Sequence, residues 1–349
     1  MKITLDNTDH TFVIAEAGSN WKVGSFEEDL KQAKNLIAIA ADAGDDAVKF
    51  QTYRPETVYA SNAGKSEYLS KNGITEDIHS IFERHAMPYE MIPKLAEFCK
   101  EKNILFMSSP FSIQDAKELD PFVEIHKVAS FEMNHIRLLE FLFKTQKPII
   151  ISTGASTYDE IDFLINLAKK YKNESIALLQ CTSKYPSPSS ALNLSVIPKL
   201  KSKYRIPVGF SDHSINPVIG PILAVGFGAT IIEKHFTLDK SLPGPDHSFA
   251  LNPDELKVMI HHIREADKAK GNGEKKILEE EKELRHFATR SIQAIKHINK
   301  GDVLLEGQNF EVLRPGNRIR GMEARFLDIV EGKRSLKTID PGDGVLDYE

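Results

Sequence analysis

The stretch TIIEKHFTLDK, residues 230–240, begins as a buried strand and then breaks the pattern of one. Its first three residues are the β-branched types that strands favour. Glu233, Lys234 and His235 follow at once, although a strand covered on both faces reads as a near-continuous apolar run. Either the strand stops and its charges are solvated, or it ends at a site that uses them.

Seven more β-like runs precede this one, each followed by a stretch of helical periodicity. The eight predicted strands are 11–18, 46–52, 104–110, 125–130, 148–154, 176–183, 206–212 and 230–236. Candidate helices include 25–44, 89–103 and 157–173, and the first opens on Ser25 with Glu28 three residues later, as in a capping box. This alternation predicts an α/β fold, a (β/α)8 TIM barrel. A doubly wound open sheet is the alternative, but it has fewer strands and a Gly-rich first turn that is absent here.

Polar side chains stand at the end of nearly every predicted strand, where a barrel carries its reactive groups. In chain order they are Glu16; Lys49 and Gln51; Ser108 and Ser109; Lys127, Ser130 and Glu132; Ser152 and Thr153; Thr182, Ser183 and Tyr185; Ser211, Asp212 and His213; and Glu233, Lys234 and His235. A single strand end of this kind is readily explained by polar residues that are exposed to solvent. Eight together predict that the residues EKH lie at the mouth of the barrel.

The types of these residues indicate a chemistry. Lys49 and Lys127, with the hydroxyls of Ser130, Ser152 and Ser211, are suited to a phosphate or to a phosphate plus a carboxylate.

Histidines on neighbouring strands are candidate metal ligands, although a lone histidine is usually structural. With only His213 and His235 offered, an oxygen-loving ion that keeps waters, such as Mn²⁺ or Mg²⁺, fits better than a closed zinc site. Glu16 and Glu132 are candidates for proton transfer or for holding a water.

Composition excludes several other classes of protein. The net charge of −5 gives no basic footprint for nucleic acid, and no apolar run approaches the ~20 residues of a membrane span. The N-terminal stretch is interrupted by Asp6, Asp9 and His10, so we expect no secretory signal. Two cysteines cannot build a disulfide framework, which favours the cytoplasm; Cys181, inside a predicted strand, is expected to be a buried structural thiol rather than a nucleophile.

Nine motifs, in order along essentially the whole chain, resemble the sialic acid synthase family, which includes synthases of N-acetylneuraminate, legionaminate and pseudaminate. They are IAEAGSN, VKFQT, SSPF, HKVASFE, ISTG, CTSKYPSP, GFSDHS, IIEKHFTLDK and PGPDHSFAL. The resemblance implies a barrel that condenses phosphoenolpyruvate with an N-acylated mannose-type sugar in its open-chain aldehyde form. The products would be a nonulosonic acid and phosphate.

The resemblance also implies a role for individual residues. Lys49, Lys127, Ser152, Ser183 and Ser211, with Ser130 close by, would hold phosphoenolpyruvate. His213 and His235 would bind a divalent metal, Mn²⁺ or else Mg²⁺ or Co²⁺, that polarises the sugar aldehyde. Glu16 and Glu132 would handle the water that adds to C2, and Gln51, Tyr185 and Asp246 would contact sugar hydroxyls.

The C-terminal part differs in texture, with short strand-like pieces and Gly and Pro turns from about Phe287. It resembles the small antifreeze-protein-like (SAF) β domain of these synthases. We expect a catalytic barrel at 1–270, a linker at 271–286 and the antifreeze-like domain at 287–349. INKGD and IDPGD are similar turns that suggest a pseudo-repeat. The resemblance implies a homodimer in which Arg314 of one chain caps the sugar's acyl group in the other barrel, with Phe287 nearby.

Three departures from the family pattern are expected near the sugar: Asn20-Trp21 where many members have Asn-His, Phe131 between Ser130 and Glu132, and Arg318 in place of a glycine. Phe131 is typical of the pseudaminate branch, whereas PGPDH (243–247) is similar to the neuraminate and legionaminate branches. Two other hypotheses remain. One is a synthase that uses an aldose phosphate, which would need a second cationic cluster. The other is a non-catalytic carbohydrate- or ice-binding protein, which would not need the polar barrel mouth.

Overall fold

A computed structural model describes residues 5–65 and 76–349 of the chain. They divide into two compact units, Met1–Gly271 and Asn272–Glu349, and each unit is described by itself.

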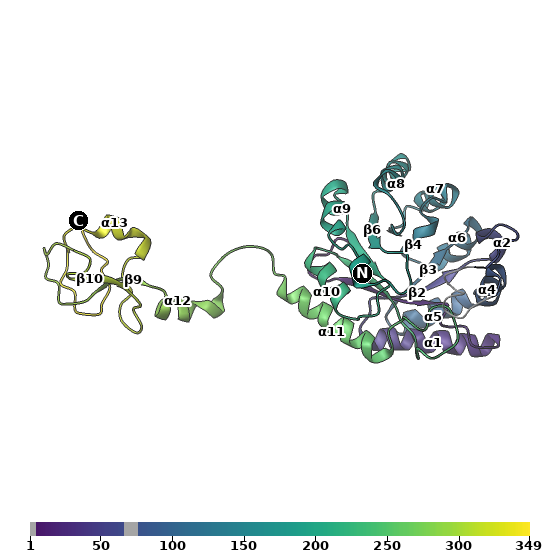
Figure 1. The fold of residues 1–349 in the computed structure, drawn as a ribbon, viewed down its shortest axis with the longest axis horizontal. Coiled ribbons are helices and arrows are strands. Elements are labelled where there is room, and N and C mark those ends of the chain that lie inside the picture. Colours follow the sequence, from purple (N-terminus) through teal and green to yellow (C-terminus); the bar gives the residue numbers. More distant parts are fainter. Residues whose placement is uncertain (1–4, 66–75) are drawn as a thin grey trace. The chain divides into compact units, whose positions relative to one another are not determined.

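The first unit is a barrel of eight parallel strands (Figure 1). The strands are β1 (Phe12–Gly18), β2 (Ala47–Thr52), β3 (Leu105–Pro110), β4 (His126–Val128), β5 (Ile149–Ser152), β6 (Ile176–Cys181), β7 (Val208–Asp212) and β8 (Ile231–His235). Their hydrogen-bonded order is β3-β2-β1-β8-β7-β6-β5-β4, and β3 and β4, at its two ends, lie against each other. Because the two ends of this order lie against each other, the sheet closes on itself, so the predicted (β/α)8 fold is confirmed and the open sheet is excluded.

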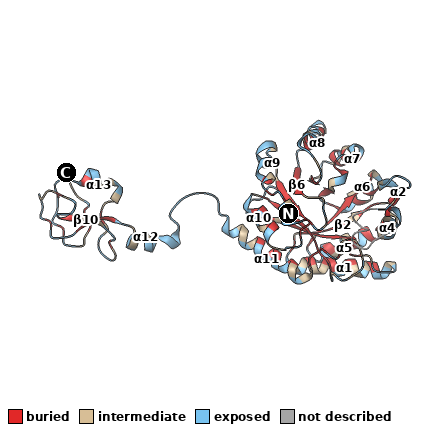
Figure 2. Ribbon diagram, in the orientation of Figure 1, coloured by how far each residue is buried: buried red, intermediate tan, exposed pale blue. Residues whose placement is uncertain are grey.

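Helices follow the strands and surround them. They are α1 (Phe26–Ala43), α2 (Pro55–Val58), α4 (Ile78–His85), α5 (Met91–Glu101), α6 (Ile113–Leu119), α7 (Ile136–Lys144), α8 (Tyr158–Lys170), α9 (Val196–Tyr204), α10 (Ile219–Gly226) and α11 (Pro253–Ala269). The predicted capping box of α1 is present, with Ser25 as N-cap and Glu28 bonded back to its backbone. Figure 2 shows buried residues concentrated in the strands, while the helices turn exposed residues outward.

The interior of the barrel explains why the reactive groups lie at one end. An apolar layer fills the lumen, formed by Ile14, Ala47, Met107, Ile125, Ile150, Ala177, Leu179 and Ile231 with Leu5. Side chains two residues apart on a strand point to the same face. Moving two residues along from Ile14, Ala47 and Ile231 therefore leads to Glu16, Lys49 and Glu233, and the same step leads from Ile125 to Lys127 and from Ile150 to Ser152. The lumen changes from apolar to charged within one such step.

Several strands end earlier than predicted, and in two of them, β4 and β6, a predicted site residue, Ser130 or Ser183, is left outside the strand. Strand β4 stops at Val128, and Ser130–Glu132 form a short 3-10 turn instead of its last residues. Strand β6 stops at Cys181, so Thr182 and Ser183 already belong to the loop. Both differences occur where side chains leave the barrel wall for the mouth.

The second unit has a small core around an antiparallel pair, β9 (Ser291–Ala294) and β10 (Phe310–Leu313). It also contains α12 (Lys282–Ala288) and α13 (Leu327–Val330). The two turns predicted to be similar pair with each other, because Ile298 and Ile339 exchange both backbone hydrogen bonds. Their glycines, Gly301 and Gly342, have φ of +94° and +90°, a left-handed conformation that favours glycine.

One expectation for this region is wrong. Phe287 does not open a strand-like piece but lies in α12, which begins inside the segment predicted as a linker. The likeness of the unit to an antifreeze domain stays a prediction. None of the helices formed by residues 5–65 and 76–349 is long and apolar enough to cross a membrane.

Candidate active site

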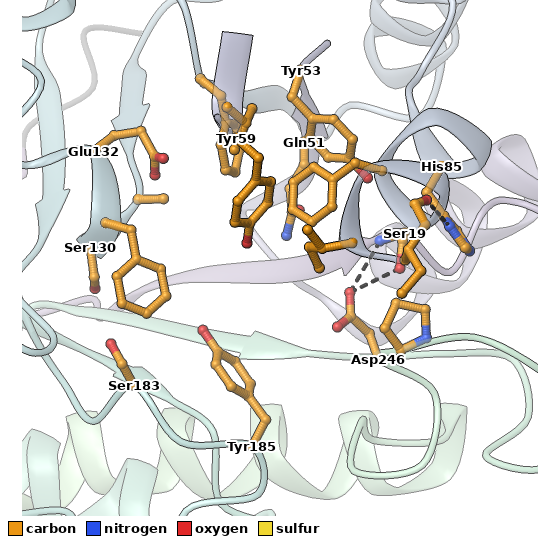
Figure 3. A pocket seen from close by; sticks show the side chains of 18 of the residues that line it. Ser19, Gln51, Tyr53, Tyr59, His85, Ser130, Glu132, Ser183, Tyr185 and Asp246 are labelled. Carbon is orange, nitrogen blue, oxygen red and sulfur yellow. Dashed lines mark hydrogen bonds between the residues drawn. The ribbon is translucent and has the colours of Figure 1, made fainter. Parts of the chain in front are cut away.

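A cavity of about 880 Å³ opens at the C-terminal ends of the barrel strands (Figure 3). Seven of the predicted site residues line it: Gln51, Ser130, Glu132, Ser183, Tyr185, His235 and Asp246. Ser130, Glu132 and Ser183 lie on one side of the pocket, and Ser19, His85 and Asp246 lie on the other. The remaining predicted residues of the barrel are buried below and join the lining residues through the contacts that follow.

Two lysines and two carboxylates form the floor. Lys49 Nζ lies 2.5 Å from Glu16 Oε2 and 3.8 Å from Glu233 Oε2, and Lys127 Nζ lies 3.5 Å from Glu233 Oε1. Glu233 thus spans both lysines, and it also accepts a hydrogen bond of 3.0 Å from Ser211 Oγ. All of these side chains are buried, so the floor is a desolvated charge cluster in which an incoming anion competes with the carboxylates.

The two carboxylates differ in how readily they ionise. Burial raises the pKa of Glu16, and Glu233 raises it further, although Lys49 opposes both. Burial would also raise the pKa of Glu233, but Lys127 and Lys49 together outweigh it and lower that pKa. Glu233 is therefore the more acidic of the two carboxylates, and Glu16 is the first of them to take a proton as the pH falls.

Hydroxyl groups surround a single glycine beside Lys127. Lys127 Nζ donates to Ser152 Oγ at 2.8 Å, and the Gly154 amide donates to Ser130 Oγ at 2.9 Å. A Cβ built on Gly154 would lie 2.3 Å from Ser183 Oγ and 2.9 Å from Ser130 Oγ, so only glycine leaves this space open. Ser183 Oγ is buried and has no hydrogen-bond partner among the residues that the structure describes. An unpaired buried donor indicates a ligand or water at this point.

The two predicted metal ligands face each other at the mouth, with ring centroids 5.6 Å apart. His213 Nδ1 is 2.9 Å from the Thr182 carbonyl oxygen, which leaves Nε2 available, and Tyr185 packs on the ring at 4.0 Å between centroids. His235 Nδ1 is buried without a hydrogen-bond partner within residues 5–65 and 76–349.

The protonation state of these rings suits a metal. Burial lowers the pKa of both histidines, in the case of His213 to about 3, so both rings are neutral at pH 7. No group of three or more His, Cys, Asp and Glu side chains that could hold a metal lies in the described part of the chain. His213 and His235 therefore fit a divalent ion that takes its other ligands from water or substrate.

The remaining predicted residues of the barrel lie around the same space. Gln51 donates from Nε2 to Glu16 Oε1 at 2.9 Å, which connects the pocket wall to the floor. Asp246 accepts hydrogen bonds from the backbone and hydroxyl of Ser19, at 3.3 and 3.1 Å. Glu132 is buried with Oε2 unpaired among the described residues, and burial raises its pKa to about 8 even though Lys127 opposes the shift.

Two parts of the site have no role predicted from the sequence. Glu233 was only a strand-end residue, yet it stands two positions before His235 and so had to share its face of the strand. The second part is an apolar wall in which Tyr53 packs on Phe82 at 4.6 Å and on Phe111 at 5.3 Å, with Tyr59 on Phe82 at 4.9 Å between centroids. The aromatic residues after the second strand were the available signal.

The three departures from the family pattern lie in different places. Phe131 is 63% exposed and lines the pocket. Trp21 is buried in the main hydrophobic core and does not line the pocket, and its predicted place near the sugar stays a prediction. Arg318, in the second unit, donates to the Pro341 carbonyl.

Two predicted site residues belong to the second unit. Arg314 is exposed, and Phe287 is 47% exposed with its carbonyl accepting from the Gly316 amide at 3.0 Å. Their predicted role at a neighbouring chain stays a prediction.

Comparisons with known proteins agree on one family. Residues 36–275 match a model of the NeuB family. The chain is 37% identical to pseudaminic acid synthase from Campylobacter jejuni, over 99% of this chain and 98% of that protein. It is also 37% identical to the N,N'-diacetyllegionaminic acid synthase of Campylobacter jejuni, over 89% and 92%. A solved N-acetylneuraminic acid synthetase from Leptospira borgpetersenii, in complex with citrate, is 35% identical with a TM-score of 0.71, covering 81% of this chain and 95% of its own.

Proposed function

The chain belongs to the NeuB family, whose members are nonulosonic acid synthases, and we propose that it condenses phosphoenolpyruvate with an N-acylated mannose-type sugar. The products are a sialic-acid-type nonulosonic acid and phosphate, so the enzyme is a C–C bond-forming transferase of the N-acetylneuraminate synthase type. The sugar is N-acetylmannosamine or a 2,4-diacetamido relative, the latter for a legionaminate- or pseudaminate-type product.

One observation carries this proposal: two buried lysines and a ring of hydroxyls adjoin two neutral histidines at a single barrel mouth. Phosphoenolpyruvate carries a phosphate and a carboxylate, and Lys49 and Lys127 are charged donors for these groups. Ser130, Ser152, Ser183 and Ser211 supply neutral donors around them. The unpaired Ser183 hydroxyl supports a phosphate at this position.

Carboxylates control the water that adds to C2 after the new carbon–carbon bond forms. Glu132 has a pKa of about 8 and lines the pocket, so it is suited to exchange a proton with the reacting groups near neutral pH. Glu16, whose pKa is also raised, stands on the floor and is tied to Gln51. Gln51, Tyr185 and Asp246 also line the cavity and are available to the hydroxyls of an open-chain sugar.

His213 and His235 would hold a divalent metal, Mn²⁺ or else Mg²⁺ or Co²⁺. When bound, such an ion supplies Lewis-acid polarisation of the sugar's aldehyde oxygen. The neutral rings, and the Thr182 carbonyl that fixes one nitrogen of His213, support this assignment.

We extend the proposal to assembly and location. A homodimer would bring Arg314 and Phe287 of one chain to the sugar end of the other barrel. Both cysteines, Cys99 and Cys181, are free and buried, which supports a reducing compartment, the cytoplasm. The product would enter the synthesis of surface polysaccharides or glycans.

Product analysis tests the reaction and the sugar together. The full chain is incubated with phosphoenolpyruvate, Mn²⁺ and a panel of 2-acetamido and 2,4-diacetamido sugars, with arabinose 5-phosphate as the competing aldose phosphate. We expect phosphate release and the mass of a nonulosonic acid with an N-acylated sugar. Product with arabinose 5-phosphate alone would contradict the proposal, and so would phosphate release without a new carbon–carbon bond.

A further inference from the structure

Lys234 is a buried lysine that none of the steps above uses. It is 1% exposed and stands on β8 between Glu233 and His235. Glu233 pairs with the lysines of the floor and His235 lines the pocket, so both face the lumen. Because side chains alternate along a strand, Lys234 points the other way, to the outside of the barrel wall.

The ammonium group of Lys234 is fully paired behind the wall. Its Nζ donates to Asp212 Oδ2 at 2.6 Å, to the Ser214 carbonyl at 2.6 Å and to Ser214 Oγ at 3.4 Å. An ammonium has three protons, and here three acceptors take them. Asp212 is the register partner of Lys234 across the β7–β8 ladder, and its other oxygen accepts from the Ser214 amide at 2.8 Å.

These contacts hold the backbone on both sides of His213. Asp212 precedes His213 and Ser214 follows it, and both are tied to a residue that directly precedes His235. Helix α10 closes the space behind them, since a Cβ built on its Gly220 would lie 2.9 Å from Asp212 Oδ2. The carboxylate therefore has little room to move, and one buried ion pair fixes the ends of β7 and β8 at the level of the two imidazoles.

Stability alone does not account for this pair. Replacing a buried ion pair by well-packed apolar residues is often neutral or stabilising, because the desolvation cost of two charges cancels much of their attraction. We propose that Lys234 and Asp212 are positioning residues that hold His213 and His235 at the separation and orientation that a divalent metal requires. This inference rests on the metal site of the proposed function.

The test measures metal binding by the full chain without substrates, from the electron paramagnetic resonance signal of free Mn²⁺ during titration. The main variant combines Asp212→Leu with Lys234→Met, which removes both charges together. Lys203→Met is the matched control, since Lys203 pairs with Asp162 at 2.8 Å on the outside of the barrel. Calorimetric binding of phosphoenolpyruvate, without metal, is measured on each variant.

We expect the double variant to keep its thermal transition and its affinity for phosphoenolpyruvate while its affinity for Mn²⁺ falls about 10- to 100-fold, the effect of losing groups that orient ligands. The control should bind Mn²⁺ like the wild type. Unchanged Mn²⁺ affinity in a folded double variant would overturn the inference, and so would an equal loss of both affinities, which signals general distortion. If the double variant does not fold, the isosteric Asp212→Asn replaces it and has to show a selective loss of Mn²⁺ affinity.

Failure of the inference and failure of the proposed function give different results. Unchanged Mn²⁺ binding by a His213→Ala variant would show that the metal site is wrongly assigned, and the inference would fail with it. The condensation itself is judged separately, from the nonulosonic acid formed by the wild-type chain.

Discussion

Adding one methyl group at Gly154 should block the phosphate end of the pocket. A Cβ on Gly154 would lie 2.3 Å from Ser183 Oγ, 2.9 Å from Ser130 Oγ and 3.1 Å from Cys181 Sγ. To reach ordinary contact the Ser183 hydroxyl has to withdraw by about 1 Å, which is enough to lose a hydrogen bond to a bound phosphate. A hydrogen bond to a charged group contributes about 1.5–3 kcal/mol, so the affinity for phosphoenolpyruvate should fall about 10- to 150-fold in Gly154→Ala.

The matched control is Gly226→Ala, at the end of α10. A Cβ there would meet no heavy atom within 4 Å, so binding should not change, and the helix should gain up to about 1 kcal/mol of stability. Neither glycine has a positive φ, so alanine can adopt the backbone at both positions. The comparison therefore isolates the steric effect at the pocket.

The measurements are calorimetric binding of phosphoenolpyruvate, its Michaelis constant at saturating sugar, and thermal unfolding. In a Ser183→Ala background the hydroxyl is already gone, so adding Gly154→Ala should cost less than it does in the wild type. A folded Gly154→Ala enzyme with wild-type affinity would refute the assignment of Ser183 and Ser130 to the phosphate. Additive effects of the two substitutions would refute the steric argument.

Three further predictions follow from the same site. Lys49→Ala and Lys127→Ala should each weaken the apparent affinity for phosphoenolpyruvate about 10- to 150-fold, with little change in the Michaelis constant of the sugar; equal effects on both substrates would mean the lysines serve another ligand. Burial raises the pKa of Glu132 from 4.5 to about 8, so as the pH rises the unfolded chain releases this proton before the folded chain does. The contribution of Glu132 to the stability of the fold therefore falls as the pH rises from about 4.5 to about 8. Denaturant titrations of Glu132→Gln across this range should show a weaker fall, and an unchanged pH dependence would contradict the assigned shift. Mixing Arg314→Ala chains with His235→Ala chains should restore part of the activity if the site is shared across a dimer, whereas confirmed subunit exchange without recovery would place the whole site in one chain.

Strand positions were predictable because the hydrophobic runs are short and regular. Most of the predicted bounds lie within two residues of the observed ones, and the lumen-facing alternation already places Lys49 and Lys127 at the mouth. The bounds were less accurate at Ser130–Glu132, where the backbone leaves the ladder for a 3-10 turn that hydrophobicity alone does not mark.

Contacts between residues far apart in the chain could not be predicted from the sequence. Glu233 spans two lysines from strands far apart in the chain, so its role depends on how the barrel closes and not on its neighbours. The packing of Tyr53 on Phe82 likewise joins the end of β2 to α4. The burial of Trp21 in the core is also a tertiary contact, which its position beside a family motif does not reveal.

Strands β3 and β4, the two edge strands of the sheet, lie against each other where the barrel closes and form a seam that runs along the strands. Every other neighbouring pair of strands is joined by a ladder of backbone hydrogen bonds, whereas these two only lie against each other. Edges without a ladder separate at lower cost than paired ones, so thermal fluctuation should widen the cylinder along this line first. Lys127 stands on β4 at one lip of the seam, and Lys49 on β2 adjoins the other. An anion bound by both lysines would link β4 to the neighbouring pair β2 and β3, so substrate binding should oppose the separation of β3 from β4.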